Sequence, residues 1–189
     1  MPSMRLFLVS ALAVALPGAA LPAAAAGPFT LSSSSFRDGE AMPRQYAGAV
    51  PTNPSCVGRN VSPALSWSNV PDGAHSIAVL MIDSEGRAGA GVNHWVAYGI
   101  RPELGGFKEG AVSQDSADYV GGKSTQGFGH YTGPCPPPNQ SDHHYGFVAI
   151  ATDLAPDALP PGLTREELMP KLAGHMLGAA GIVGRFRHP

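Results

Sequence analysis

The clearest hydrophobic pattern in the chain is a series of short apolar runs separated by turn residues. Three runs are rich in β-branched and aromatic residues and predict strands: Ser76 to Ile82, Trp95 to Ile100 and His144 to Thr152. A shorter run, Leu65 to Trp67, precedes a Pro-Asp-Gly turn sequence. Because no long helix separates these runs, a doubly wound α/β fold is not expected. The pattern predicts a mainly β domain with an antiparallel or mixed sheet.

One segment near the C-terminal end has helical spacing. Thr164 and Glu167 form a capping-box pattern, which is typical of a helix start. The apolar residues that recur at the spacing of one helix face are Leu168, Leu172 and Met176. Pro170 lies inside this pattern, so we expect either a kink there or a second helical piece that begins at this proline.

The N-terminal residues have the pattern of a secretory signal peptide. Arg5 is followed by the apolar run Leu6 to Leu16 and by small residues at Ala24 to Ala26. The run is too short for a membrane span, which needs about 20 apolar residues. We therefore expect a signal peptide over residues 1–26, one domain over residues 27–189 and a periplasmic or secreted protein. An uncleaved anchor is the alternative, and no later segment is expected to span a membrane.

The charge and composition of the chain narrow the choice of partner. The formal net charge is −2, and the 12 basic residues form no stripe, so a nucleic-acid partner is not expected. The 24 glycines and 19 prolines show no collagen-like period and predict a domain rich in turns and loops.

The chain has two cysteines, Cys56 and Cys135. In the oxidising compartment that export implies, we expect them to form a disulfide. Closing a loop of about 80 residues stabilises a fold by about 4.5 kcal/mol in the chain-entropy model. Two alternatives stay open. Both thiolates could bind zinc, although neither cysteine belongs to a C-x-x-C pair, or both could be buried free thiols.

Side chains that can bind a ligand stand at the ends of the predicted strands. Asp83 follows the first strand, His94 opens the second, and the group His143-His144-Tyr145 opens the third. If these strands are neighbours, the groups converge at one edge of the sheet. Imidazole and phenol donors suit an oxyanion such as phosphate, and a carboxylate favours the protonated imidazole. We expect His94, His143 and Tyr145 to be donors and Asp83 to orient a histidine.

A proline-rich stretch precedes the third strand. Proline fixes φ, so Pro134 to Pro138 should form a stiff, extended wall beside the histidines. Gly133 comes directly before this wall. Because glycine has no side chain, we expect Gly133 to let a ligand approach the backbone closely.

Together these motifs resemble the phosphatidylethanolamine-binding protein family, specifically its bacterial, Raf-kinase-inhibitor-like branch. The matching segments are Cys56-x-Gly58-x-Asn60-Val61-Ser62-Pro63-x-Leu65-x-Trp67, the strand that ends at Asp83, His94-Trp95-Val96-x-Tyr98-x-Ile100, Tyr131-x-Gly133-Pro134-Cys135-Pro136-Pro137 and His143-x-Tyr145. The resemblance implies a central antiparallel sheet, a second smaller sheet and a few peripheral helices.

The resemblance also implies a small anion pocket at one end of the fold. Its positions map onto Asp83, His94, Gly133, His143 and Tyr145. Family members bind phosphate-type head groups or acidic ligands there, and several inhibit kinases or proteases, so a protein partner is a further expectation. No catalytic role is general to the family.

The chain departs from the family at one loop. The family usually has Asp-Pro-Asp-x-Pro where this chain has Asp83-Ser84-Glu85-Gly86. Both prolines are absent, and the loop borders the implied pocket, so its rigidity and the ligand preference differ from the family pattern. Arg87 adds a positive charge near the mouth, or else is a solvated loop residue.

Two other classes of function compete with anion binding. The chain has no G-x-S-x-G elbow of a serine hydrolase, so we expect no enzyme, although a small hydrolase with a pocket histidine as general base is an alternative. A zinc or copper site is the other alternative. Its ligands would come from Asp83, His94, His130, His143 and His144. Their spacing has no metal signature, so we expect no metal and no cofactor.

Overall fold

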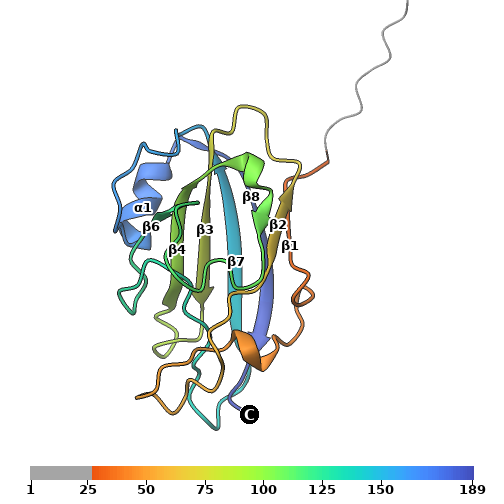
Figure 1. The fold of residues 1–189 in the computed structure, drawn as a ribbon, viewed down its shortest axis with the longest axis vertical. Coiled ribbons are helices and arrows are strands. Elements are labelled where there is room, and N and C mark those ends of the chain that lie inside the picture. The colour runs from red at the N-terminus through yellow and green to blue at the C-terminus, as the bar shows by residue number, and fades with distance from the viewer. Residues whose placement is uncertain (1–26) are drawn as a thin grey trace, which may run out of the picture.

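Two antiparallel sheets form the fold of residues 27–189, the part of the chain that this computed structural model describes (Figure 1). The strands of the five-stranded sheet, in spatial order, are β6 (Val120–Gly121), β4 (Val92–Ile100), β3 (Ser76–Asp83), β7 (His143–Thr152) and β8 (Met176–Phe186). Those of the three-stranded sheet are β1 (Thr30–Ser32), β2 (Leu65–Ser68) and β5 (Gly106–Phe107). The predicted fold class is confirmed, and the predicted signal peptide lies outside the described residues.

The helices are short and peripheral. The α-helix is α1 (Arg165–Leu172), and two 3-10 turns, η1 (Arg44–Tyr46) and η2 (Pro102–Leu104), lie in the connections. Between residues 27 and 189, no helix has the length and apolar character needed to cross a membrane.

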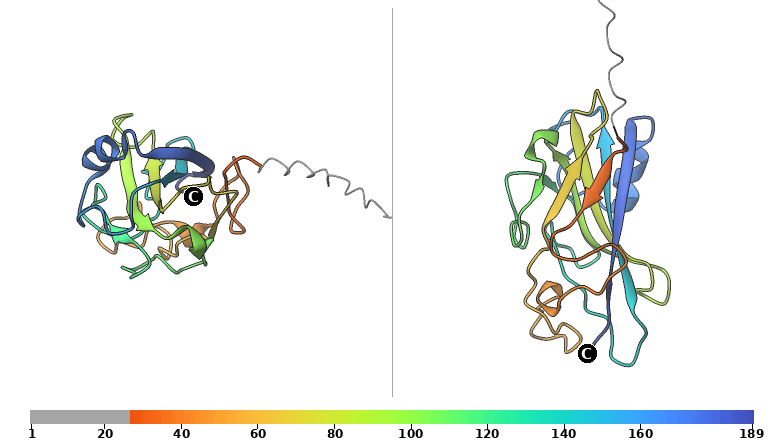
Figure 2. Two further views of the ribbon diagram at one scale, coloured as in Figure 1. Left: turned by 90° about the horizontal axis from the view of Figure 1, so that it is seen from above. Right: turned by 90° about the vertical axis from the view of Figure 1, so that its right-hand side faces the viewer.

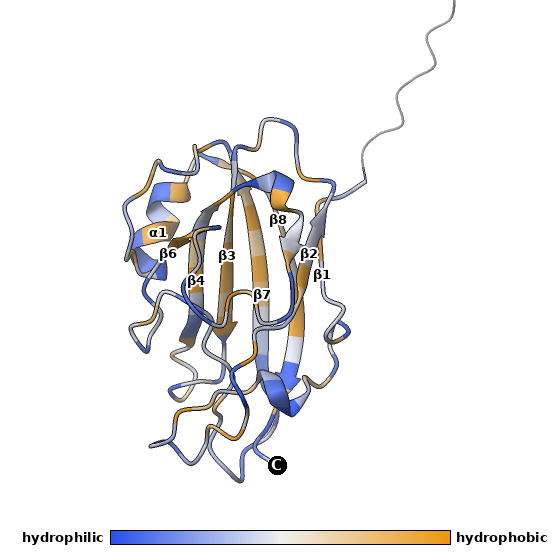
Figure 3. Ribbon diagram, in the orientation of Figure 1, coloured by the Kyte–Doolittle hydropathy of each residue, from blue (hydrophilic) through white to orange (hydrophobic). Residues whose placement is uncertain are grey.

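The large sheet is buried on both faces, which explains the continuous apolar runs of its central strands. In β3, Ile77, Val79 and Met81 point into a core shared with the small sheet, whereas Ala78 and Leu80 point into a second core. Leu168 and Leu172 of α1 close this second core. The small sheet and α1 therefore cover opposite faces of the large sheet (Figure 2). The apolar colouring of the central strands follows this burial (Figure 3).

The predicted helix start is confirmed, but the predicted helix is too long. The Thr164 hydroxyl accepts a hydrogen bond from the Glu167 N–H at 3.3 Å, and the Glu167 carboxylate accepts one from the Thr164 N–H at 2.9 Å. The helix then ends at Leu172, because the chain leaves helical geometry at Ala173 and turns at Gly174, whose φ is +83°. No second helical piece begins at Pro170, and Met176 opens β8 instead.

Strand register brings the predicted site residues to one end of the large sheet. Asp83, the last residue of β3, pairs with Val92 of β4 and with Tyr145 of β7. The end of β3 and the starts of β4 and β7 therefore meet at the lower end of the sheet in Figure 1. The convergence expected for neighbouring strands is present.

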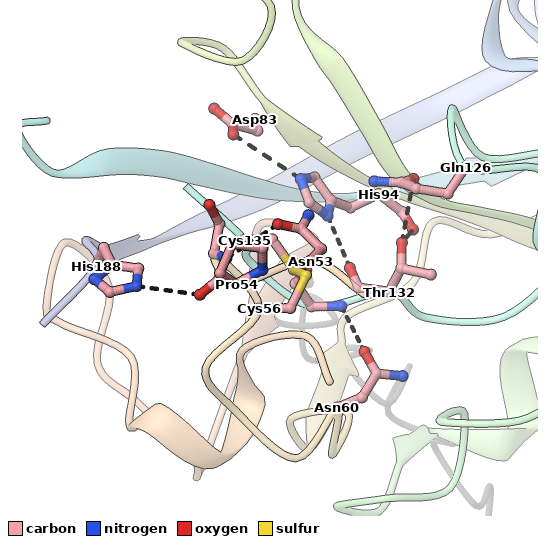
Figure 4. Close-up of a disulfide and its surroundings, with 12 residues drawn as sticks. Asn53, Pro54, Cys56, Asn60, Asp83, His94, Gln126, Thr132, Cys135 and His188 are labelled. Atoms are coloured by element: carbon pink, nitrogen blue, oxygen red, sulfur yellow. Dashed lines mark hydrogen bonds and ion pairs between the residues drawn. A yellow bond between two sulfur atoms is a disulfide. The ribbon is translucent and has the colours of Figure 1, made fainter. Parts of the chain in front are cut away.

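The predicted disulfide is confirmed. Cys56 and Cys135 are bonded, across a sequence separation of 79 residues. The bond joins the loop after η1 to the proline-rich stretch that precedes β7 (Figure 4). It thereby fixes two distant segments beside the end of the large sheet where the histidines lie.

Candidate functional site

A cavity of about 390 Å³ lies at the end of the large sheet where β3, β4 and β7 meet. Asp83, His94 and His143 line it from these strands, and the loop after β3 adds Glu85 and Arg87. A further wall is made by Cys135, Pro136, Pro137 and Gln140. A larger hollow of about 560 Å³ lies beside η2, but no histidine lines it. The smaller cavity is therefore the candidate binding site.

Asp83 is the buried centre of the cavity, with 4% of its surface exposed. One carboxylate oxygen, Oδ1, accepts hydrogen bonds from the backbone N–H groups of Glu85 at 3.0 Å and Gly86 at 2.9 Å. The other, Oδ2, lies 2.8 Å from Nδ1 of His143. Burial by itself raises the pKa of Asp83, but the hydrogen bonds and positive charge of His94 and His143 outweigh it and lower the pKa to about 2. The carboxylate is therefore ionised at neutral pH.

His94 lies on the other side of this carboxylate. Its Nδ1 donates to the backbone carbonyl of Thr132 at 2.8 Å, and its Nε2 lies 3.9 Å from Oδ2 of Asp83 (Figure 4). The carbonyl of Thr132 fixes the Nδ1–H tautomer of the neutral ring, so Nε2 of His94 becomes a donor only when the ring takes up a second proton.

His143 is held at both ring nitrogens. Nδ1 faces the Asp83 carboxylate, and Nε2 lies 2.7 Å from Oε1 of Gln140. The side chain is 6% exposed. Gln140 is therefore part of the site, although the sequence gives no signal that would single out one amide in the polar segment before β7.

Tyr145 lies beneath the two histidines and does not line the cavity. Its side chain is fully buried, and its ring packs against the His94 ring in a T-shaped arrangement at a centroid distance of 5.3 Å. Within residues 27–189 its hydroxyl has no hydrogen-bond partner. Burial, followed by the negative charge of Asp83, raises the pKa of Tyr145, so the phenol stays neutral.

Gly133 also lies outside the cavity lining. Its N–H donates to Oδ1 of Asn60 at 2.8 Å, and a Cβ at this position would come within 2.7 Å of the backbone of Ala47 and Gly48. The space that its missing side chain leaves is filled by the chain after η1. Another segment of the protein therefore approaches the Gly133 backbone closely, and the ligand contact expected at Gly133 stays a prediction.

The altered loop is tied to β7 by an exposed pair. Both carboxylate oxygens of Glu85 accept hydrogen bonds from His144, one from its backbone N–H at 2.9 Å and one from Nδ1 at 2.9 Å. Partial burial raises the pKa of Glu85, but the bonds from His144 outweigh it and lower the pKa. These bonds hold the loop in place without the two prolines of the family pattern.

Three side chains of the site could reach one metal ion. Asp83, Glu85 and His143 each offer an atom within 4.8 Å of the others. Both ring nitrogens of His143 and both carboxylate groups already take part in hydrogen bonds, which a metal would have to replace. His130, a candidate ligand from the sequence, lies elsewhere, 3.0 Å from Asp115.

Comparison with known proteins places this chain in a known protein family. The family model described as "Phosphatidylethanolamine-binding protein" matches residues 32–187. A Mycobacterium tuberculosis protein named "Putative lipoprotein LppC" is 36% identical over 89% of this chain and 77% of its own. An Aquifex aeolicus protein named "UPF0098 protein" is 31% identical over 82% of this chain and 86% of its own.

Solved structures show the same fold. The crystal structure of E. coli YbcL, described as a new member of the mammalian PEBP family, superposes with a TM-score of 0.76 and 25% identity over 85% of this chain and 99% of its own. The Chlamydia trachomatis protein CT736, titled a phosphatidylethanolamine-binding protein homologue, superposes with a TM-score of 0.73 and 29% identity over 86% of this chain.

Proposed function

The chain belongs to the phosphatidylethanolamine-binding protein family, and from this membership and the cavity at the end of its large sheet we propose that it binds a small anionic ligand with a phosphate-type group. The observation that carries the proposal is the buried Asp83 carboxylate between His94 and His143. A carboxylate that is ionised and buried favours the charged form of an adjacent imidazole. Charged imidazoles are good hydrogen-bond donors to phosphate oxygens.

The charge of the cavity depends on its two histidines. Arg87 offsets only one of the two carboxylates that line the cavity, Asp83 and Glu85. With both histidines neutral the lining has one net negative charge, and with both protonated it has one net positive charge. Phosphate should therefore bind more tightly when both histidines are protonated than when both are neutral.

Calorimetric titration of the metal-free protein near pH 6 tests the proposal. Inorganic phosphate and phosphoethanolamine are the probes, and zinc is the control for the metal alternative. We expect His143→Ala to weaken phosphate binding by at least tenfold, because a hydrogen bond from a charged donor contributes about 1.5–3 kcal/mol. His175→Ala is the matched control, because His175 pairs with Asp153 far from the cavity.

Three results contradict the proposal. Unchanged phosphate affinity in a folded His143→Ala variant removes the histidine from the site. Tight zinc binding without phosphate binding identifies a metal site instead. Turnover of an ester or phosphoester that both His94→Ala and His143→Ala abolish identifies an enzyme.

We also propose that the ligand-binding cavity serves a regulatory or inhibitory role toward a protein partner. A separate proposal is that residues 1–26 are removed on export and that the protein is periplasmic or secreted. The lipoprotein name of the mycobacterial relative and the Cys56–Cys135 disulfide support export. Mass spectrometry of the protein recovered from its native compartment tests this directly: a chain that begins at Gly27 is expected, and an intact N-terminus contradicts it.

A further inference from the structure

The side chain of Gln140 covers the ligand-facing nitrogen of His143. Its Oε1 atom lies 2.7 Å from Nε2, while Nδ1 of the same ring faces Asp83. This is the only hydrogen bond of the Gln140 side chain within the described part of the chain. Every ring nitrogen of His143 is therefore already occupied by a group of the protein.

The chemistry of the amide fits both protonation states of His143. In the imidazolium both nitrogens carry hydrogens, and the Asp83 carboxylate and the Gln140 carbonyl oxygen accept them. In the neutral ring with its hydrogen on Nδ1, a rotated amide would donate its N–H to Nε2 instead. A carboxylate or a lysine at position 140 could not serve both states, because each offers only acceptors or only donors.

We propose that Gln140 is a gate on the anion site: its amide oxygen occupies the donor position of His143, and a phosphate oxygen binds only after displacing it. This inference rests on the proposed function, because it concerns the same cavity. It adds a residue that sets the affinity by competing with the ligand.

The surrounding loop allows the side chain to leave without disturbing the strand. Gln140 is exposed, as are its neighbours Asn139 and Ser141. The end of the loop is fixed, because Asp142 accepts a hydrogen bond from Arg185 at 3.0 Å. Rotation of the Gln140 side chain therefore opens His143 to the cavity while β7 stays paired with β8.

Phosphate titrations of the wild type, Gln140→Ala and Gln140→Glu test the gate. Removing the competing oxygen in Gln140→Ala should tighten phosphate binding about tenfold, because phosphate no longer has to displace the hydrogen bond at Nε2 of His143. Gln140→Glu should weaken it by more than tenfold, because a carboxylate is a stronger competitor and repels phosphate. Ser141→Ala is the control, an exposed neighbour with no side-chain hydrogen bond in the described residues, and should bind like the wild type.

A measurement without ligand tests the contact itself. In nitrogen NMR spectra of the phosphate-free protein, the Nε2 resonance of His143 should move in Gln140→Ala and stay in place in Ser141→Ala. An unmoved resonance overturns the gate.

The titrations separate the gate from the proposed function. If the wild type binds phosphate and Gln140→Ala binds equally or less well, the gate is wrong and the anion site stands. If Gln140→Ala binds and the wild type does not, the gate is supported in its strongest form. If neither protein binds phosphate, the proposed function fails and the gate fails with it.

Discussion

Replacing Asp83 with asparagine removes the central charge of the cavity while keeping the shape of the side chain. The amide oxygen of Asn still accepts the N–H groups of Glu85 and Gly86, which lie 3.0 and 2.9 Å from Oδ1 in the wild type. The amide nitrogen then faces Nδ1 of His143, which must become an acceptor. Asp83→Asn should therefore fold, with His143 held as the neutral ring.

The size of the effect follows from the pKa of Asp83, which falls from its ordinary value of 3.8 to about 2 in the folded protein. A carboxyl group whose pKa is lowered by folding stabilises the fold above its unfolded pKa, and this contribution disappears as the pH falls through the folded pKa. The shift corresponds to about 2.5 kcal/mol at pH 6. At pH 2.5 about 0.8 kcal/mol of it remains.

Urea unfolding of both proteins, followed by tryptophan fluorescence between pH 6 and pH 2.5, checks this expectation. The free energy of unfolding should be about 2.5 kcal/mol lower in Asp83→Asn at pH 6, and the difference should shrink to about 0.8 kcal/mol at pH 2.5. Asp115→Asn is the matched control. It removes another Asp–His pair, 3.0 Å apart, but the Asp115 side chain is 83% exposed, so the loss should stay below about 1 kcal/mol. A constant difference across the pH range would refute the assignment of the stabilisation to the charge.

Two further predictions concern the disulfide and the glycine that precedes the proline-rich stretch. Replacing both Cys56 and Cys135 with serine should lower the free energy of unfolding by about 2–5 kcal/mol and weaken phosphate binding, whereas adding a reductant to the double variant should change neither. Gly133→Ala should lower the free energy of unfolding by about 1–3 kcal/mol, because its Cβ would overlap the backbone of Ala47 and Gly48. Gly146→Ala, whose Cβ would meet only the Ile82 carbonyl at 3.9 Å, is the control in the same urea assay, and an equal loss in both variants would contradict the steric explanation.

The central strands could be predicted because their pattern and their environment agree. Strands β3, β4 and β7 are continuous apolar runs, and they are buried on both faces of the large sheet. The end of an antiparallel strand lies beside the start of its neighbour. The end of β3 therefore meets the starts of β4 and β7, which brings Asp83, His94 and His143 together. β8 was beyond prediction, because Gly178 to Gly181 is a run of small residues with no strand preference of its own. Pairing with β7 along its length makes it a strand.

The site could be predicted only as far as strand ends determine it. Strand patterns do not determine which way a loop side chain points or which cavity it enters. Nothing in the sequence therefore singles out Gln140 or the close contact of Gly133 with Ala47 and Gly48. Tyr145 follows His143 by two residues in β7, so both side chains lie on the same face of the strand. Tyr145 lies deeper, however, where the core surrounds it. Placing it above or below the histidines needs the three-dimensional packing.

The disulfide makes completion of the cavity a step in the maturation of the protein. Cys135 belongs to the cavity wall, and in the reduced chain that wall is attached to the loop after η1 by non-covalent contacts such as the Gly48 N–H to the Pro134 carbonyl, at 2.8 Å. A newly made chain in a reducing environment would therefore hold the fold with a looser wall. Oxidation of one pair of sulfurs then fixes this wall, so for the proposed phosphate-type ligand we expect the affinity to rise in the compartment where the chain is oxidised.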